Sequence, residues 1–264
     1  SAIRNNPLTS AKRWVWELMQ NAKDIPNKFG KVSIEIELVS EKELQFKHNG
    51  DPFSIDNITG LIRQVSSKDS LNSDEDTTGK FGTGFICTHL LSDIIDVCGI
   101  LKYNGHRRFY LSLDRSGRSS EELMPRIKDV EKVYLEPEKH FDEIPNYEGN
   151  RYESDFDTIF KYHLTSVEKL DSAKAGLDDL VNTLPITLVT QSKKIKCVRV
   201  KDRVRGTDVK YICNSMELDK DVTFSEIIIN SEKKQYLSYI TPEVALTIEV
   251  QKEKNGYYYF ELFR

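Results

Sequence analysis

The sequence of 264 residues predicts an α+β fold, and three observations support this prediction. First, residues 14–25 place apolar side chains on one arc of a helix and polar side chains on the opposite arc. Second, residues 35–46 contain two short alternating runs that predict a strand pair, and residues 156–162 alternate in the same way. Third, apolar residues recur at helical spacing over 167–184, and strand-like runs dominate residues 186–263.

The first predicted helix carries an acid, an amide and a second acid on one face. At about 100° per residue, Glu17, Asn21 and Asp24 fall within roughly 60° of one another. Such a group can serve a water molecule, a metal ion and a supporting contact. The alternative is a solvated polar stripe on an amphipathic helix, which is the commoner meaning of this pattern.

A glycine-rich segment, Gly79-Lys80-Phe81-Gly82-Thr83-Gly84-Phe85, lies about 60 residues further along. Its three glycines allow the backbone to approach a ligand closely. Apolar residues at near-helical spacing over 85–95 predict a helix directly after them, and a helix start suits phosphate groups. The alternative is a plain surface turn. The order of the glycines fits neither a P-loop nor a dinucleotide fingerprint.

Between these segments, the run His48-Asn49-Gly50-Asp51-Pro52-Phe53 follows the predicted strand pair. Asn49-Gly50 is a strong turn signal, and Pro52 ends the strand. Apolar residues at helical spacing over 55–65 then predict a second helix, with Ser54 or Asp56 as its N-cap.

Together, in this order and spacing, the three segments resemble the GHKL ATPase superfamily, whose members include DNA gyrase, the ninety-kilodalton heat-shock chaperone, sensor histidine kinases, MutL, MORC proteins and sacsin. The resemblance covers roughly residues 7–165 and implies the Bergerat fold, an α/β sandwich in which a mixed sheet is backed by helices. The turn sequence looks most like the sacsin-like and chaperone-like branch. The matching positions are Glu17, Asn21, Ala22 and Asp24 of the N-box, and Gly79, Gly82 and Gly84 of the glycine motif.

The resemblance implies a chemistry for each matched residue. Glu17 would orient or deprotonate the water that attacks the γ-phosphate, and Asn21 would place its oxygen on Mg²⁺. Asp24 would act behind them and hold the pocket. The implied nucleotide contacts are Asn21, Asp24, His48, Asn49, Gly50, Gly79, Lys80, Phe81, Gly82, Thr83, Gly84, Phe85 and Thr158.

One position departs from the family pattern. The family has an aspartate that accepts a hydrogen bond from the adenine amino group, and this sequence has His48. A neutral imidazole accepts only in the right tautomer, so adenine selectivity over guanine is open. The alternative for His48 is an exposed histidine at the end of a strand. Thr158 is the candidate for the threonine that lies beneath the base, although threonine also favours strands in general.

The sequence predicts two domains. Residues 1–165 form the nucleotide-binding domain, with a lid at about 66–84 that orders when nucleotide binds. Residues 166–264 begin a second, β-rich α/β domain of the middle or transducer type, and we expect the chain to be a fragment of a longer protein. Pro185 is expected to end the helix that begins at Val167. Strands are then expected at 186–189, 195–200, 209–213, 223–230, 234–240, 244–249 and 257–263.

Composition restricts the partners. The net charge of −4 gives no general attraction to nucleic acid or anionic membranes, and no apolar run approaches the length of a membrane span. Seven Lys or Arg in residues 193–205 mostly alternate with apolar residues, which favours the wet face of a strand pair over a nucleic-acid site. Lys193 or Lys194 could sense the γ-phosphate. The four cysteines lack metal-binding spacing and suit a cytoplasmic protein.

Three functions remain open at this stage. The first is Mg²⁺-dependent ATP hydrolysis that drives conformational change or self-dimerisation of a larger cytoplasmic protein. The second is a nucleotide-binding switch with negligible hydrolysis, for which His48 gives a reason. The third is a histidine-kinase-type catalytic domain, which the β-rich second half and the lack of a recognisable phosphoacceptor helix disfavour.

Overall fold

The computed structural model describes residues 7–25, 27–63, 83–135, 146–254 and 256–260. Its eleven strands form one sheet in the order β11-β10-β9-β8-β7-β6-β1-β2-β5-β3-β4. The helices are α1 (Pro7–Lys23), α2 (Ile55–Arg63), the 3-10 helix η3 (Thr83–Leu90), α3 (Ser120–Leu135) and α4 (Val167–Thr190). The strands are β1 (Val32–Ser40), β2 (Glu43–His48), β3 (Ile94–Lys102), β4 (His106–Asp114), β5 (Thr158–His163), β6 (Ile195–Asp202), β7 (Thr207–Asp219), β8 (Val222–Ile229), β9 (Glu232–Ile240), β10 (Ala245–Lys252) and β11 (Tyr258–Tyr259).

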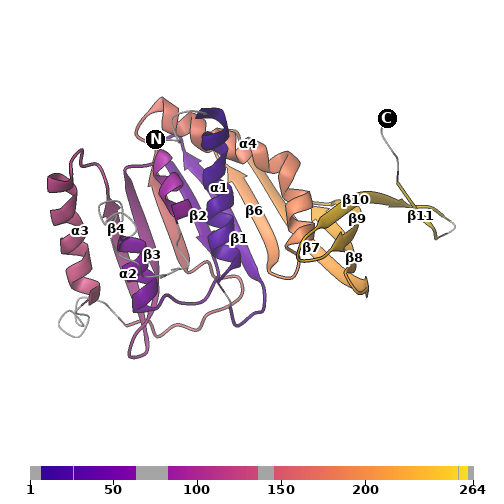
Figure 1. Cartoon of the computed structure of the whole chain (residues 1–264), viewed down its shortest axis with the longest axis horizontal. Coiled ribbons are helices and arrows are strands. Elements are labelled where there is room, and N and C mark those ends of the chain that lie inside the picture. Colours follow the sequence, from indigo (N-terminus) through magenta and orange to yellow (C-terminus); the bar gives the residue numbers. More distant parts are fainter. Residues whose placement is uncertain (1–6, 26, 64–82, 136–145, 255, 261–264) are drawn as a thin grey trace.

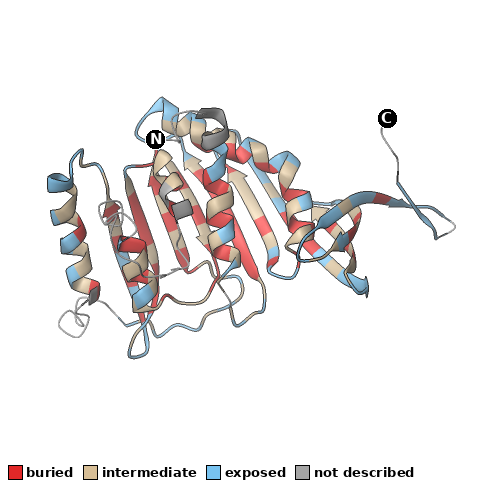
Figure 2. Ribbon diagram, in the orientation of Figure 1, coloured by how far each residue is buried: buried red, intermediate tan, exposed pale blue. Residues whose placement is uncertain are grey.

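The helices cover one face of this sheet. Helices α1, α2 and α4 lie over the strands, and α3 lies beside the β4 edge (Figure 1). Alternation along β1 explains the arrangement, because Ile34 and Ile36 enter the core while Glu35 and Glu37 take the opposite face. Buried residues follow the central strands, whereas β10 and β11 are mostly exposed (Figure 2). The predicted α+β fold, a mixed sheet backed by helices, is confirmed.

The two halves of the chain meet in the middle of the sheet. Strands β1 and β6 pair in parallel, with Ile34 opposite Val198, while the other strand pairs of the sheet are antiparallel. Residue 165 therefore lies between β5 and α4 of one continuous sheet with its helices. The division into two domains stays a prediction. None of the described helices has the length and apolar character needed to cross a bilayer.

Two local predictions are wrong. The segment 85–95 is helical only to Leu90 and enters β3 at Ile94, because apolar residues there serve two consecutive elements. Pro185 does not end α4, which continues to Thr190 and includes the predicted strand at 186–189. Proline removes one helical hydrogen bond. Leu184, Leu188 and Val189 are buried on either side of it, so packing against the sheet outweighs that loss.

Helices α1 and α4 touch through a glycine. Trp14 is fully buried and donates from its indole Nε1 to the carbonyl of Ser172, 3.0 Å away. A Cβ atom added at Gly176 would lie 2.4 Å from Nε1 of Trp14 and 2.5 Å from its Cε2. The indole ring therefore occupies the space that any other residue at 176 would need.

We expect Gly176→Ala to destabilise the protein by about 2 kcal/mol, because the added methyl group overpacks a rigid ring. In a helix without such contact, glycine to alanine normally stabilises by about 0.5–1 kcal/mol. Gly60 in α2 supplies that control, since an added Cβ there meets nothing within 4 Å. Urea unfolding should therefore shift the midpoints of Gly176→Ala and Gly60→Ala in opposite directions. Equal stabilisation of both variants would contradict this account of the α1–α4 contact.

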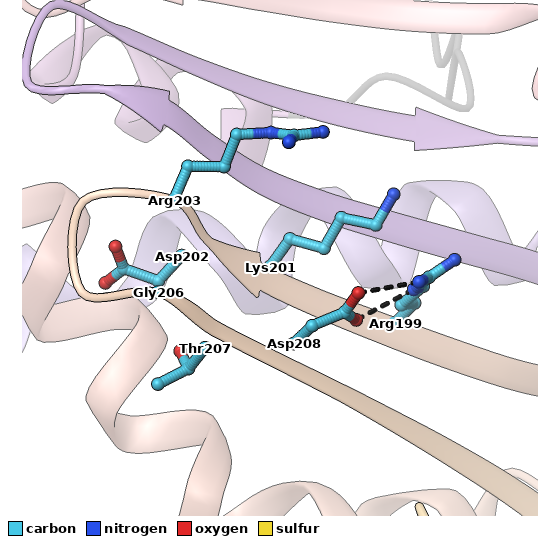
Figure 3. A pocket seen from close by; sticks show the side chains of 7 residues that line it. All are labelled: Arg199, Lys201, Asp202, Arg203, Gly206, Thr207 and Asp208. Atoms are coloured by element: carbon cyan, nitrogen blue, oxygen red, sulfur yellow. Dashed lines mark hydrogen bonds and ion pairs between the residues drawn. The ribbon is translucent and has the colours of Figure 1, made fainter.

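The uncovered face of the central strands carries paired charges. Lys201 of β6 pairs with Glu35 at 2.8 Å, Arg203 pairs with Glu37, and Arg199 pairs with Asp208 of β7. Side chains from β6, β7 and the turn between them line a hollow of about 560 Å³ on this face (Figure 3). Lys and Arg side chains of residues 193–205 thus form ion pairs with carboxylates of this chain. Such pairs are expected on the solvated face of a strand pair.

Candidate functional site

Glu17 lies on the side of α1 that packs against η3. Its side chain is 25% exposed, and Arg13 one turn earlier donates to its Oε1 at 3.2 Å. Burial and the nearby charge of Glu17 raise the pKa of the Cys87 thiol on η3 to about 11. The structure therefore brings the predicted catalytic acid next to the helix that follows the glycine motif. Because the Arg13–Glu17 pair is exposed and weak, a ligand can replace it at little cost.

Asn21 follows Glu17 by one turn and lacks a hydrogen-bond partner. Its Nδ2 atom is buried and has no hydrogen-bond partner among the described residues. An amide left unpaired in this way costs about 1–3 kcal/mol, so native proteins keep few of them. The role of Asn21 as a ligand for magnesium stays a prediction.

Asp24 directly follows α1 and ties its end to the loop between α4 and β6. Its carboxylate accepts from Gln20 Nε2 and from Lys194 Nζ, each at 3.1 Å. Lys193 points elsewhere and pairs with Glu217 of β7. Lys193 and Lys194 were both considered as γ-phosphate sensors. Of these two lysines, Lys194 is the one that pairs with Asp24. A supporting position for Asp24 matches its predicted role, which stays a prediction.

His48, the last residue of β2, is buried, with 2% of its surface exposed. Its interpretation as an exposed strand-end histidine is therefore wrong. The ring stacks on Phe160 of β5 with 6.3 Å between centroids, and Phe160 in turn contacts Phe85 of η3 at 5.7 Å. Thr158 is opposite His48 in the β2–β5 register and is 1% exposed. An aromatic column thus connects the turn segment, the strand threonine and the end of the glycine motif.

The two turn residues after His48 are engaged with the protein itself. Asn49 Oδ1 accepts from the Ser33 N–H at 2.7 Å, and its Nδ2 donates to the Glu153 carbonyl at 2.9 Å. A Cβ atom at Gly50 would lie 2.9 Å from His48 Nδ1 and 3.0 Å from Ile25, which follows α1. Both residues therefore fix the turn after β2, and their contacts to nucleotide stay predictions.

Arg151 is the site residue that sequence reasoning missed. Its side chain is 9% exposed, and its Nη2 donates to the Gly50 carbonyl at 2.5 Å. Its Nε donates to Asp157 Oδ2 at 2.9 Å, immediately before Thr158. It lies in an irregular segment without hydrophobic periodicity, so no pattern marked it.

The glycine motif is described only in part. Thr83 and Gly84 begin η3, and Phe85 is buried against the column of rings. The predicted contacts Gly79, Lys80, Phe81 and Gly82, and the lid segment 66–82, lie outside the described residues. Their roles stay predictions.

The side chains of the site offer few ligands for a metal ion. Within the described part of the chain, no group of three or more His, Cys, Asp or Glu side chains could hold a metal ion. Magnesium keeps several waters and takes few protein ligands, so the single amide oxygen of Asn21 fits a magnesium–phosphate complex. The site does not offer the closed set of ligands that a structural zinc needs.

No protein-family model matches this sequence, and no curated protein matches it either. The structure is similar to the topoisomerase IV ATP-binding domain of Francisella tularensis, solved in complex with a small-molecule inhibitor, with a TM-score of 0.43 and 10% identity over 80% of this chain and 93% of that one. It is also similar to the B-subunit of DNA gyrase from Myxococcus xanthus, with a TM-score of 0.45 and 9% identity over 86% of this chain and 66% of that one. The first of these structures is an ATP-binding domain, and DNA gyrase is a member of the superfamily that the sequence motifs resemble.

Proposed function

We propose that this chain binds a magnesium–ATP complex between α1, η3 and the ends of β2 and β5, and that it hydrolyses the ATP. The observation that carries the proposal is the Asn21 side chain, whose Nδ2 atom is buried and has no hydrogen-bond partner among the described residues. It stands one turn after Glu17, whose charge helps to raise the pKa of Cys87 on η3. A solvated polar stripe, the alternative from sequence, would leave such an amide in water.

Each residue of the site has a role in this proposal. The Glu17 carboxylate orients the attacking water and accepts its proton, which typically contributes about 10²–10⁴-fold. Asn21 Oδ1 holds Mg²⁺, whose charge, when it is bound, neutralises that of the phosphate oxygens. Asp24, paired with Lys194, keeps the end of α1 in place. The glycine motif, with Lys80, is proposed to enclose the phosphates.

The base is proposed to lie against the buried wall formed by His48 and Thr158. This wall is apolar on both sides of the histidine ring, because Phe46 and Phe160 flank it. The motif resemblance assigns position 48 to the substituent on C6 of the purine. Nucleotide binding is proposed to drive conformational change or self-dimerisation of the whole protein, as in the superfamily.

Calorimetric titration with ATP, ADP and GTP, with and without Mg²⁺, tests the proposal. We expect Asn21→Ala to lose the Mg²⁺-dependent part of ATP affinity, about tenfold or more, because the metal loses its one amide ligand. Asn182→Ala, an exposed position on α4, is the matched control and should bind as wild type. The proposal fails if the wild-type chain binds no nucleotide, or if Asn21→Ala binds Mg²⁺-ATP as tightly as the control.

A further inference from the structure

The uncovered face of the sheet becomes apolar beyond the first half of β7. Lys210 of β7 lies opposite Arg199, and Met216 follows Lys210 by an even number of positions, so all three side chains are on the uncovered face. Cross-strand partners in an antiparallel sheet share a face, and two apolar rows of such partners run across β8, β9 and β10. The rows are Met216, Phe224, Leu237 and Ile248, and Val222, Tyr239 and Leu246.

These two rows form an apolar patch that is exposed to solvent. Leu246, Met216 and Tyr239 expose 62%, 59% and 47% of their surface. On the opposite face of the same strands, Ile227 of β8 and Tyr236 of β9 are buried, and α4 packs against both strands. Contiguous apolar surface of this kind is uncommon on monomeric proteins and marks an interaction surface.

The outer edge of β10 borders this patch and is open along most of its length. On one side, β9 pairs with residues 245–250. On the other side, β11 pairs with Gln251 and Lys252, and no described strand continues along the rest of β10. The hairpin of β10 and β11 projects from the end of the sheet (Figure 1). Open backbone N–H and C=O groups on such an edge can pair with another strand.

The residues that direct their backbone groups to this edge can be identified from the hairpin. The Glu253 N–H donates to the Tyr257 carbonyl across it. Backbone groups of alternate residues point to the same side of an antiparallel strand. Ala245, Thr247 and Glu249 therefore direct their N–H and C=O groups to the open edge, while the residues between them bond to β9.

Nothing in the sequence of β10 protects the edge from pairing. Edge strands usually carry lysine, proline or a bulge that prevents it. Residues 245–250 contain neither lysine nor proline, and their pairing with β9 is regular. Their one charge is that of Glu249, which lies 3.8 Å from Lys234 of β9. The segment also contains Thr247, Ile248 and Val250, which are β-branched residues that favour strands.

We propose that β10 pairs antiparallel with β10 of a second copy of this chain, about a two-fold axis at Thr247, and that the resulting dimer forms without nucleotide. In this register, Leu246 lies opposite Ile248 of the second copy and Ala245 lies opposite its Glu249. Apolar side chains thus meet apolar side chains, and no like charges are opposed. The two apolar patches lie on the same side of one continuous sheet. The inference does not depend on the proposed function, because the nucleotide site takes no part in it.

Sedimentation velocity of the 264-residue chain without nucleotide, over a range of concentrations, tests the proposal. We expect a reversible monomer–dimer equilibrium. Thr247→Pro removes an N–H that faces the open edge and keeps the bonds to β9, so it should raise the dissociation constant of the dimer tenfold or more. Thr247→Ala, which also lacks the hydroxyl group but keeps the N–H, is the control and should dimerise as the wild type does. Urea unfolding of both variants checks that the monomer stays folded.

Side-chain variants test the register. Leu246→Glu should weaken the dimer tenfold or more, because it places a carboxylate opposite Ile248 of the second copy. Val181→Glu on α4 is the control, since Val181 is also 62% exposed, and it should leave the equilibrium unchanged. Adding Ile248→Lys to Leu246→Glu should restore the dimer, because each new carboxylate then faces a new ammonium group across the two-fold axis.

Three outcomes would overturn the inference. They are a wild-type chain that stays monomeric or forms a series of species larger than a dimer, a dimer that appears only with nucleotide, and wild-type dimerisation of both Thr247→Pro and Leu246→Glu. A chain that dimerises in this way but binds no nucleotide would contradict the proposed function alone.

Discussion

Replacing Glu17 with glutamine is expected to lower the rate of ATP hydrolysis by about 10²–10⁴-fold while Mg²⁺-ATP affinity stays within about twofold. Glutamine has the shape of glutamate but cannot take a proton from water. In the proposed function, nucleotide binding depends on Asn21 and on the buried side chains of His48 and Thr158, which this substitution leaves unchanged. Single-turnover phosphate release with protein in excess of ATP measures the chemical step directly.

The control for Glu17→Gln is Glu121→Gln, an exposed glutamate in the first turn of α3, which should hydrolyse ATP as the wild type does. A Glu17→Gln variant with wild-type turnover would show that Glu17 is not the base. Wild-type protein that binds Mg²⁺-ATP without releasing phosphate would favour the nucleotide-binding switch instead. In that case, the proposed nucleotide binding is supported and the proposed hydrolysis is wrong.

The residues on regular elements were those that sequence reasoning could place. Glu17 and Asn21 are one turn apart on a strongly periodic helix, so their common face followed from spacing alone. His48 and Thr158 end and begin strands with clear alternation. Their direct opposition, however, is a matter of strand register between segments about 110 residues apart, which no local pattern encodes.

The parts that sequence reasoning missed depend on non-local contacts. The parallel pairing of β1 with β6 joins segments about 160 residues apart and places the strands of both halves of the chain in one sheet. Strand β3 was missed because the apolar residues over 85–95 fit helical spacing and were assigned to one helix, although they belong to η3 and to the start of β3. Arg151 donates to the backbone carbonyls of Asn49 and Gly50. Every residue has a backbone carbonyl, so the sequence does not mark these partners.

The uncovered sheet face gives the largest expected stability effect, because one lysine there neutralises two buried acids. Lys47 of β2 is 3.0 Å from Glu35 and 2.7 Å from Glu37 of β1, and both carboxylates are less than a tenth exposed. We expect Lys47→Met to destabilise the protein by about 2–3 kcal/mol, because it leaves buried charge partly unpaired. Lys201 still pairs with Glu35, and Arg203 still pairs with Glu37. The loss of stability should therefore be smaller than for two carboxylates without any partner.

Lys161→Met is the matched control on the neighbouring strand β5. Its lysine is more exposed and lies 3.9 Å from Glu43, so its loss should cost less than about 0.5 kcal/mol. Urea unfolding at pH 7 compares the two variants. Equal stabilities for Lys47→Met and Lys161→Met would mean that the charged face contributes packing rather than charge pairing.

The pH dependence of the Lys47→Met effect separates these two contributions. Burial alone would raise the pKa of Glu37, but hydrogen bonds from Lys47 and Arg203 outweigh it and hold the pKa below its ordinary value of 4.5. A carboxylate with a lowered pKa stabilises the fold above that ordinary value, and this contribution is lost as the pH falls through the folded-state pKa. In Lys47→Met, Glu37 can take up a proton at low pH, which relieves its unpaired charge. The stability difference from wild type should therefore be largest near neutral pH and shrink below about pH 4.5, whereas a difference due to packing alone would not change with pH.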